Sequence, residues 1–292
     1  MLFEGINKSF LGIKYKKNLK SQIIIVPYGL ENTVTYGKGT KKGPRNIISA
    51  SHHLELYDED LGYQISDKVG IQTLKTKTIK KNNPMALKEL EAITQNIIKE
   101  NKFPFIIGGE HTITAGIISA LNKSKKPITI VQFDAHTDLR DSYQNIKYSH
   151  ACAMRRCLDF SNVKLISFAI RSTSKNEISF IKRNKKRIKI FYAKDKNDWD
   201  SKKIYEMIKN QNVYITFDVD VFDPSLLPAT GTPEPGGLFW NETIDLLKLI
   251  TKNSKVIGAD INELAPIINH EASNFIAAKL VYKLIGLIFK EK

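Results

Sequence analysis

The sequence predicts an α/β protein of three layers, with helices on both faces of a mainly parallel sheet. Three observations support this prediction. Apolar runs rich in β-branched and aromatic residues alternate with segments of helical periodicity, as in β/α units. Most of the runs are apolar without interruption, which is typical of strands covered on both faces. Clusters of carboxylates and imidazoles directly follow several runs, where open α/β sheets place their binding sites.

Seven segments show the strand pattern and are expected to form the sheet. Each is a short, mainly apolar run bounded by polar, glycine or proline residues. The segments are residues 22–28, 103–107, 128–133, 163–169, 188–192, 213–217 and 255–259.

Helices are expected between these strands, and two of them have clear patterns. For residues 84–100, Asn83 followed by Pro84 predicts a cap and a proline in the first turn. The buried stripe predicted for this helix is Leu87, Leu90, Ile93, Ile97 and Ile98. The last helix is predicted at residues 271–289. Its predicted buried face is Phe275, Ile276, Leu280, Leu284 and Leu287.

The domain organisation is predicted to be simple. Proline and glycine concentrate in residues 224–237, and loops of this length inside compact domains are usually functional. No internal repeat and no linker divides the chain, so residues 1–292 are expected to form a single domain.

Composition narrows the classes of function. The net charge is +15, but only seven of the 45 basic residues are arginines, and the lysines are spread along the chain. A nucleic-acid interface would favour clustered arginines with aromatic side chains among them, so no nucleic-acid partner is expected. Two cysteines five residues apart, no secretory signal and no transmembrane-length apolar run predict a cytoplasmic protein without a membrane partner.

Three metal-type ligands follow the strand predicted at residues 128–133. Asp134, His136 and Asp138 are spaced two apart, so they share one face of an extended chain. Asp218 and Asp220 repeat this spacing after the strand at 213–217. Polar groups that converge in this way at strand ends have no packing role, and they indicate a site for two cations.

A histidine completes the set. In Gly108-Gly109-Glu110-His111-Thr112, paired glycines allow a tight turn after a strand and leave His111 at the carboxyl edge of the sheet. Two imidazoles and four carboxylates without a thiolate suit manganese or a similar divalent ion, and they argue against structural zinc.

In their order along the chain, these motifs resemble the ureohydrolase family, which comprises arginases, agmatinases and related amidinohydrolases. The matching segments are residues 37–45, 108–112, 133–138, 149–152, 217–237 and 260–266. The most specific match combines residues 218–224 with residues 231–238. Glu110 and Thr112 replace an aspartate and a serine that are common in the family, and both changes are expected to be mild. The resemblance implies an arginase-like form of the predicted fold.

The resemblance also implies the site chemistry. One Mn²⁺ would be held by His111, Asp134, Asp138 and Asp218. The other would be held by His136, Asp134, Asp218 and Asp220. Co²⁺ or Ni²⁺ are possible substitutes. A hydroxide between the metals would attack the guanidinium carbon of the substrate.

Catalytic roles are implied for three residues. Glu263 would pair with the substrate guanidinium, because a carboxylate binds this group with two directional hydrogen bonds. His150 would move protons between the site and solvent, for which an imidazole is suited near neutral pH. Asp138 is the third catalytic residue, because it would bind a metal ion at the reacting centre.

The substrate is expected to be a small guanidine compound. The segment 139–148 is not the polar loop with which arginases read an amino acid, and residues 148–156 look like those of agmatinases. Agmatine, which would give urea and putrescine in polyamine biosynthesis, is therefore expected first. Aminopropylagmatine, guanidinobutyrate and arginine are alternatives, and Arg140 would favour a carboxylate.

Two alternatives from other classes are a basic nucleic-acid-binding protein on the same fold and a non-catalytic paralogue. The first predicts binding that weakens steeply with salt. The second is not supported, because all of the expected site residues are present. Family resemblance implies a homo-oligomer, either a trimer or a hexamer.

Overall fold

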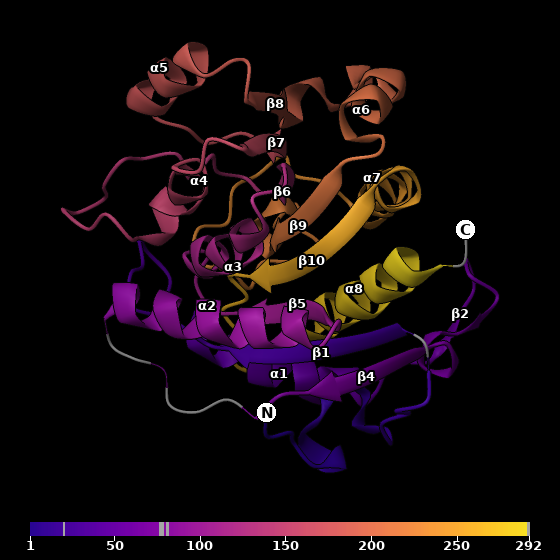
Figure 1. The fold of residues 1–292 in the computed structure, drawn as a ribbon. Coiled ribbons are helices and arrows are strands. Elements are labelled where there is room, and N and C mark those ends of the chain that lie inside the picture. Colours follow the sequence, from indigo (N-terminus) through magenta and orange to yellow (C-terminus); the bar gives the residue numbers. More distant parts are fainter. Residues whose placement is uncertain (20, 76–78, 80–81, 291–292) are drawn as a thin grey trace.

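The computed structural model describes residues 1–19, 21–75, 79 and 82–290. Its centre is an eight-stranded sheet in the order β4-β1-β5-β10-β9-β6-β7-β8, and all of its neighbouring strands are parallel (Figure 1). The strands are β1 (Ser21–Tyr28), β4 (Val69–Thr73), β5 (Phe103–Gly108), β6 (Ile128–Phe133), β7 (Val163–Ile170), β8 (Ile188–Tyr192), β9 (Asn212–Asp218) and β10 (Lys255–Asn262). The predicted fold class is confirmed.

All seven predicted strands are present, and most extend by one to three residues beyond the predicted bounds. The edge strand β4 was missed. It is five residues long and contains Gly70, so it lacks the unbroken apolar run of a central strand. A small antiparallel hairpin, β2 (Tyr57–Asp58) with β3 (Tyr63–Gln64), was also missed because each strand has only two residues.

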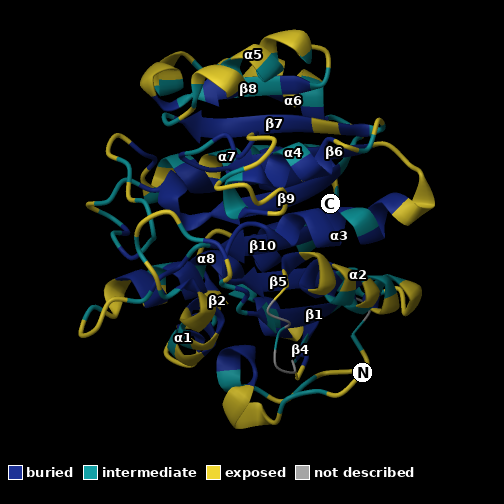
Figure 2. Cartoon of the chain, turned by 90° about the vertical axis from the view of Figure 1, so that its left-hand side faces the viewer, coloured by how far each residue is buried: buried dark blue, intermediate teal, exposed yellow. Residues whose placement is uncertain are grey.

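Helices cover both faces of the sheet and complete the three layers. On one face are α1 (Gly43–Ser51), α6 (Ser201–Ile208), α7 (Trp240–Asn253) and α8 (Ala272–Phe289). On the other face are α2 (Asn83–Lys99), α3 (Ile113–Leu121), α4 (Ala153–Cys157) and α5 (Lys175–Arg183). The strands between them are almost entirely buried, whereas the outer sides of the helices are exposed (Figure 2). This burial on both faces explains the uninterrupted apolar runs in the sequence.

Two details of the predicted helices were wrong. The N-cap of α2 is Asn82, whose side chain accepts a hydrogen bond from the Met85 backbone N–H. Asn83 lies in the first turn instead, because its side-chain amide is directed to Glu110. Phe275 in α8 is 42% exposed, since the first turn of this helix buries its small polar residues Ser273 and Asn274.

A row of aromatic rings crosses the sheet directly below its carboxyl edge. Phe133 ends β6 and lies in register with Phe168 of β7 and Phe217 of β9. The ring of Phe133 stacks on those of Phe168 and Phe217 with centroid distances of 5.6 and 5.1 Å. Because all three rings are fully buried, this row fixes the last residues of the strands from which the polar clusters begin.

Helix α8 is tied to the β2–β3 hairpin by a buried lysine. Lys283 Nζ lies 2.9 Å from Asp58 Oδ2, 3.3 Å from Glu59 Oε1 and 2.7 Å from Asp60 Oδ2. The side chains of Lys283 and Asp58 are 1% and 0% exposed, so each charge depends on the other. By length and composition α8 could cross a membrane, but 67% of it is buried inside the protein, as in a core helix.

Replacing this lysine should destabilise the protein strongly. Lys283→Met leaves the buried Asp58 carboxylate without its cation, and we expect a loss of about 3 kcal/mol in the free energy of unfolding. The matched variant Lys248→Met removes a 40% exposed partner of Asp60 and should cost less than about 1 kcal/mol. Urea unfolding followed by circular dichroism measures both values, and equal losses would show that the Asp58 carboxylate does not depend on Lys283.

The same cluster predicts the direction of an acid effect. Hydrogen bonds from Lys283 and Lys248 lower the pKa of Asp60 from 3.8 to about 2. A carboxyl whose pKa is lower in the folded state stabilises the protein above pH 3.8 and loses this contribution as the pH falls towards 2. The free energy of unfolding should therefore fall less steeply over this pH range in Lys283→Met than in the wild type.

Candidate active site

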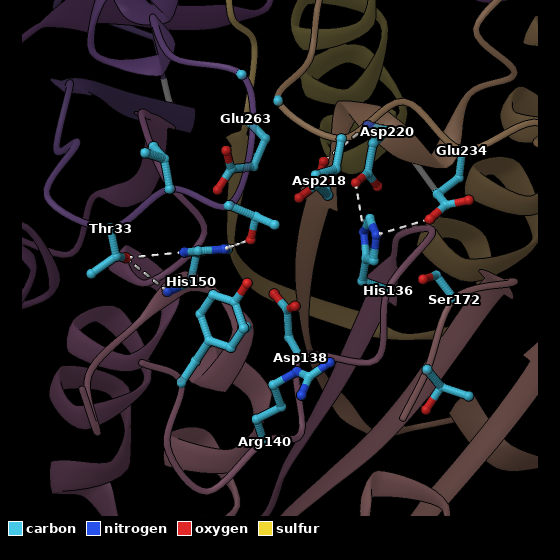
Figure 3. A pocket seen from close by; sticks show the side chains of 18 of the residues that line it. Thr33, His136, Asp138, Arg140, His150, Ser172, Asp218, Asp220, Glu234 and Glu263 are labelled. Atoms are coloured by element: carbon cyan, nitrogen blue, oxygen red, sulfur yellow. Dashed lines mark hydrogen bonds and ion pairs between the residues drawn. The ribbon is translucent and has the colours of Figure 1, made fainter. Parts of the chain in front are cut away.

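The polar residues singled out in the sequence meet at the carboxyl ends of four neighbouring strands. β5, β10, β9 and β6 lie side by side in the sheet. The turn after β5 carries His111, and Glu263 follows β10 directly. Asp218 ends β9, with Asp220 in the next turn, and residues 134–138 follow β6. Figure 3 shows several of these side chains directed into one cavity.

The turn after β5 requires its second glycine. A Cβ atom on Gly109 would lie 2.1 Å from the backbone oxygen of Leu30, a distance that no side chain tolerates. This close approach brings the segment after β1 against the segment before α3, with Gly109 N donating to the Tyr28 carbonyl at 3.0 Å. His111 therefore enters the site from a turn that is packed on both sides.

Asp134, His136 and Asp138 converge, but not as a regular extended strand. β6 ends at Phe133, and Asp138 has a φ of 50°, in the left-handed region. Glu263, after β10, also has a left-handed φ, of 64°. Non-glycine residues in this region cost about 1 kcal/mol or more, and they concentrate at functional sites. The bend turns the Asp138 carboxylate back towards His111.

Two groups of ligand-type atoms share one aspartate. His111 Nδ1 lies 3.1 Å from Asp134 Oδ2, 3.0 Å from Asp138 Oδ2 and 3.4 Å from Asp218 Oδ2. His136 Nδ1 lies 2.8 Å from Asp220 Oδ2 and 3.7 Å from Asp134 Oδ1. The two oxygens of Asp134 thus face different groups. The separations within each group suit a cation at its centre.

The hydrogen bonds around His111 leave one ring nitrogen free for a cation. Thr216 donates its hydroxyl proton to the buried Asp260 carboxylate at 2.7 Å. The Thr216 oxygen must then accept from His111 Nε2, which lies 2.8 Å away, so the ring proton is on Nε2. The buried Nδ1 faces the carboxylates of Asp134, Asp138 and Asp218, and the raised pKa of His111 means that these carboxylates hold a proton there. A cation that replaces this proton would take Nδ1 as a ligand.

The electrostatics of the cluster lead to the same conclusion. Burial, followed by the charges of Asp220 and Asp134, raises the pKa of Asp218 well above its ordinary value. Burial and Asp134 raise the pKa of Asp138 to about 7. Burial lowers the pKa of His111, but the surrounding carboxylates outweigh it and raise this pKa well above its usual range. Protons held by these groups thus offset the negative charge of the cluster. Divalent cations would replace these protons, so metal binding would release them to solvent.

The proline- and glycine-rich segment at 224–237 forms one wall of the cavity. Asp223 holds it in place by accepting hydrogen bonds from the backbone N–H groups of Gly236 and Gly237. Arg171 donates to backbone carbonyls on this wall, including that of Glu234 at 2.9 Å. The Glu234 carboxylate lies 3.6 Å from His136 Nε2 (Figure 3). Asp223 therefore holds the loop in place. Glu234 contacts Nε2 of His136, the ring nitrogen that does not face Asp220.

The remaining two predicted catalytic residues also line this cavity, whose volume is about 260 Å³. Glu263 is half-buried, and its Oε1 accepts a hydrogen bond of 2.6 Å from the His111 backbone N–H. His150 begins a 3-10 turn, His150–Cys152, and Figure 3 shows it across the cavity from His136. Arg140 and Tyr143 lie at its mouth, with the guanidinium carbon 5.2 Å from the ring centroid.

Several residues of the site were missed at the sequence level. Thr33 and Thr35 contact His150, Glu177 lines the cavity, and Thr216 orients His111. Threonines carry no motif of their own, and their position follows only from the tertiary fold. Glu177 gave a usable signal, because Ser174 three residues before it forms a capping box with it at the start of α5.

Comparisons with known proteins agree with this geometry. The model of the family described as "Arginase family" matches residues 21–286. The N(1)-aminopropylagmatine ureohydrolase of Synechocystis sp. is 37% identical, over 90% of this chain and 88% of its own. The chain belongs to the arginase family. The agmatinase of Pyrococcus horikoshii is 34% identical, over 90% of this chain and 91% of its own.

Solved structures support the fold of this arginase-family protein. The agmatine ureohydrolase of Thermoplasma volcanium superposes with a TM-score of 0.81 at 29% identity, covering 93% of this chain and 91% of its own. The family implies a binuclear site for divalent metal ions, and the two ligand groups around Asp134 are candidates for it. The predicted family resemblance is therefore confirmed.

Metal addition should stabilise the folded chain through these groups. At a metal concentration a hundredfold above Kd, binding to the folded state alone adds about 2.7 kcal/mol per site. Asp134→Asn weakens both groups, so the rise in Tm on adding Mn²⁺ to chelator-treated protein should be much smaller in this variant. The control Asp159→Asn alters an exposed aspartate outside the cavity and should keep the full rise. Equal rises in both variants would exclude a metal site at Asp134.

Proposed function

We propose that this protein is a binuclear metal-dependent amidinohydrolase that releases urea from agmatine. The observation that carries the proposal is the position of His111 Nδ1, which lies within 3.4 Å of three carboxylates beside the cavity that the Glu263 carboxylate also lines. A cluster of this kind binds cations, and a carboxylate beside it can hold a guanidinium. Family membership supplies the reaction class.

The proposed ligands are those expected from the sequence. His111, Asp134, Asp138 and Asp218 would hold one Mn²⁺. His136, Asp134, Asp218 and Asp220 would hold the other. When bound, the metal pair supplies a nucleophile by lowering the pKa of water, and it offsets the charge of the aspartates.

Glu263 would bind and orient the guanidinium. Its backbone is held by a hydrogen bond from Glu263 N to the Gly109 carbonyl at 2.8 Å. The His111 N–H fixes one carboxylate oxygen at 2.6 Å, so the plane of the carboxylate is set before the substrate binds. Preorganisation of this kind lowers the cost of positioning a flexible substrate. The guanidinium carbon would then face the ligand groups.

His150 would accept and release the proton that the reaction moves. Burial, reinforced by His136 and His111, lowers the pKa of His150 to about 4. Its imidazole is therefore neutral at pH 7, and a proton that it accepts during the reaction would be released readily. Since its side chain lies between the cavity and the surface, it is placed to exchange that proton with solvent.

The part of the cavity away from the metals would hold the amine end of the substrate. Thr35 and Tyr143 line it with hydroxyl groups and Glu177 adds a carboxylate, and such groups suit an ammonium. Agmatine is therefore the substrate that we propose first. Aminopropylagmatine is the second candidate, because a relative that is 37% identical is named N(1)-aminopropylagmatine ureohydrolase. The Arg140 guanidinium at the mouth would favour guanidinobutyrate instead only if it faced the substrate.

We infer a single-domain enzyme of the cytoplasm, acting in polyamine biosynthesis as a trimer or hexamer. Neither nucleic acid nor a membrane would be a partner. The even spread of lysines along the chain supports the first of these exclusions.

The activity is tested by urea release. The Mn²⁺-loaded protein should release urea from agmatine, and His136→Ala should abolish release and lower the metal stoichiometry measured by elemental analysis. The control His53→Ala alters an exposed histidine and should retain both. Unchanged turnover in His136→Ala would falsify the mechanism. Aminopropylagmatine, guanidinobutyrate and arginine, assayed in parallel, decide the substrate.

Glu263→Gln tests substrate positioning separately from metal binding. The amide keeps the size of the side chain but loses the charge that pairs with the guanidinium. A charge-assisted hydrogen bond is worth about 1.5–3 kcal/mol, so kcat/KM should fall by about 10- to 100-fold. The metal content should stay at the wild-type value. A wild-type kcat/KM in this variant would remove Glu263 from substrate binding.

A further inference from the structure

His150 is held between two threonine hydroxyls on opposite sides of its ring. Thr33 Oγ1 lies 3.1 Å from His150 Nδ1 and also accepts from the His150 backbone N–H at 3.1 Å. Thr35 Oγ1 lies 2.8 Å from Nε2. Figure 3 shows the contacts of Thr33 and places His150 between them and the cavity. Which ring nitrogen carries the proton depends on how these hydroxyls are oriented.

The orientation of the Thr33 hydroxyl is decided by Glu110. This carboxylate is fully buried. Its Oε2 accepts from the backbone N–H groups of Asn32 and Thr33 at 2.7 and 2.6 Å. Its Oε1 accepts from the side chains of Asn83 and Thr112 at 3.0 and 2.6 Å. The backbone N–H groups and the Asn83 amide can only donate, so both oxygens of Glu110 lie in positions that accept hydrogen bonds.

The Thr33 hydroxyl also lies 3.0 Å from Glu110 Oε1, and it must donate its single proton there. A hydroxyl has one proton and two acceptor positions. With the proton directed to Glu110, Thr33 Oγ1 can only accept from His150, both at the backbone N–H and at Nδ1. The ring proton is therefore on Nδ1, and Nε2 keeps its lone pair.

The other neighbours of the ring are compatible with this arrangement. Thr35 can donate to the Nε2 lone pair, because its hydroxyl rotates freely to suit. Ser149 Oγ is 3.3 Å from Nδ1 and can accept a share of the same proton. The ring of Tyr143 meets the imidazole edge-on, with a centroid distance of 5.6 Å, and restricts its rotation.

We propose that Glu110 and Thr33 are positioning residues that fix the neutral His150 as its Nδ1–H tautomer, so that protons enter and leave through Nε2 on the Thr35 side. The uptake of one proton at Nε2 gives the imidazolium, and its release from Nε2 restores the starting state. The tautomer follows from the geometry alone. Its catalytic consequence rests on the proposed function, in which His150 moves protons.

Glu110 thereby acquires a role, although its replacement of the aspartate that is common in the family was expected to be mild. Glu110 lies outside the two groups of metal-type ligands. Its carboxylate accepts hydrogen bonds from three segments of the chain. The donors are Asn32 after β1, Asn83 at the start of α2 and Thr112 in the turn after β5. The replacement therefore connects the loop that carries Thr33 to the framework of the sheet.

The test is the ¹⁵N NMR spectrum of the six histidines in protein loaded with a diamagnetic divalent ion such as Zn²⁺, because Mn²⁺ would broaden the signals of nearby nuclei. His150 is assigned by the loss of its signals in His150→Gln. The wild type should show a protonated Nδ1 and an unprotonated Nε2 for His150. Thr33→Ser keeps the hydroxyl and should retain this pattern. Thr33→Val keeps the shape without the hydroxyl, and its spectrum should shift towards the Nε2–H tautomer. Thr35→Val should retain the wild-type pattern.

Activity gives a second readout. In Thr33→Val, kcat for urea release should fall about tenfold with KM unchanged, and Thr33→Ser should restore it. An Nε2–H signature in the wild type, or an unchanged spectrum in Thr33→Val, would overturn the proposal, and the wild-type spectrum decides even if Thr33→Val fails to fold. If the wild type shows the Nδ1–H form but releases no urea from any guanidine substrate, the proposed function fails and the positioning of His150 stands.

Discussion

The structure is organised around four aspartates that converge in a buried space. Burial, followed by repulsion between these like charges in a medium of low polarity, raises the pKa values of Asp138 and Asp218. Only a rigid framework can hold them together. It consists of neighbouring parallel strands, the row of stacked rings of Phe133, Phe168 and Phe217, and a tight glycine turn at Gly109. Under the proposed function, two divalent cations turn this repulsion into binding.

His111 and His150 are oriented by the same arrangement of a buried carboxylate and a threonine. A buried carboxylate takes the proton of a threonine hydroxyl, and the threonine oxygen is then left to accept from the imidazole. Asp260 acts through Thr216 on His111, and Glu110 acts through Thr33 on His150. In His111 this leaves Nδ1 facing the aspartates, where a cation would bind in place of a proton. In His150 it leaves Nε2 unprotonated. The two threonines thereby direct opposite ring nitrogens to the site, one suited to a metal ion and the other to proton exchange.

The central sheet and the ligand set could be predicted because they depend on local sequence. Continuous apolar runs identify buried strands, and parallel strands must end at the same edge, so Asp134 and Asp218 were expected to meet. The contributions of Thr33 and Thr216 could not be predicted, since a threonine acquires its role only from a carboxylate that is distant in sequence. The edge strand β4 and the exposed Phe275 were missed for a related reason. The environment of an edge strand or of a first helical turn is set by packing, and local periodicity does not report it.

The charge of the chain as a whole opposes the proposed substrate, yet the local field favours it. A net charge of +15 repels a cationic guanidine compound at long range, but surface lysines are screened beyond about 8 Å at physiological ionic strength. Two divalent cations would neutralise the four aspartates and leave the carboxylates of Glu263 and Glu234 on the cavity wall. The third carboxylate, that of Glu177, is offset by Arg140, whose Nε lies 4.0 Å away. The cavity therefore remains negative where a cationic substrate enters, and its local charge, rather than the overall charge, determines which ligand binds.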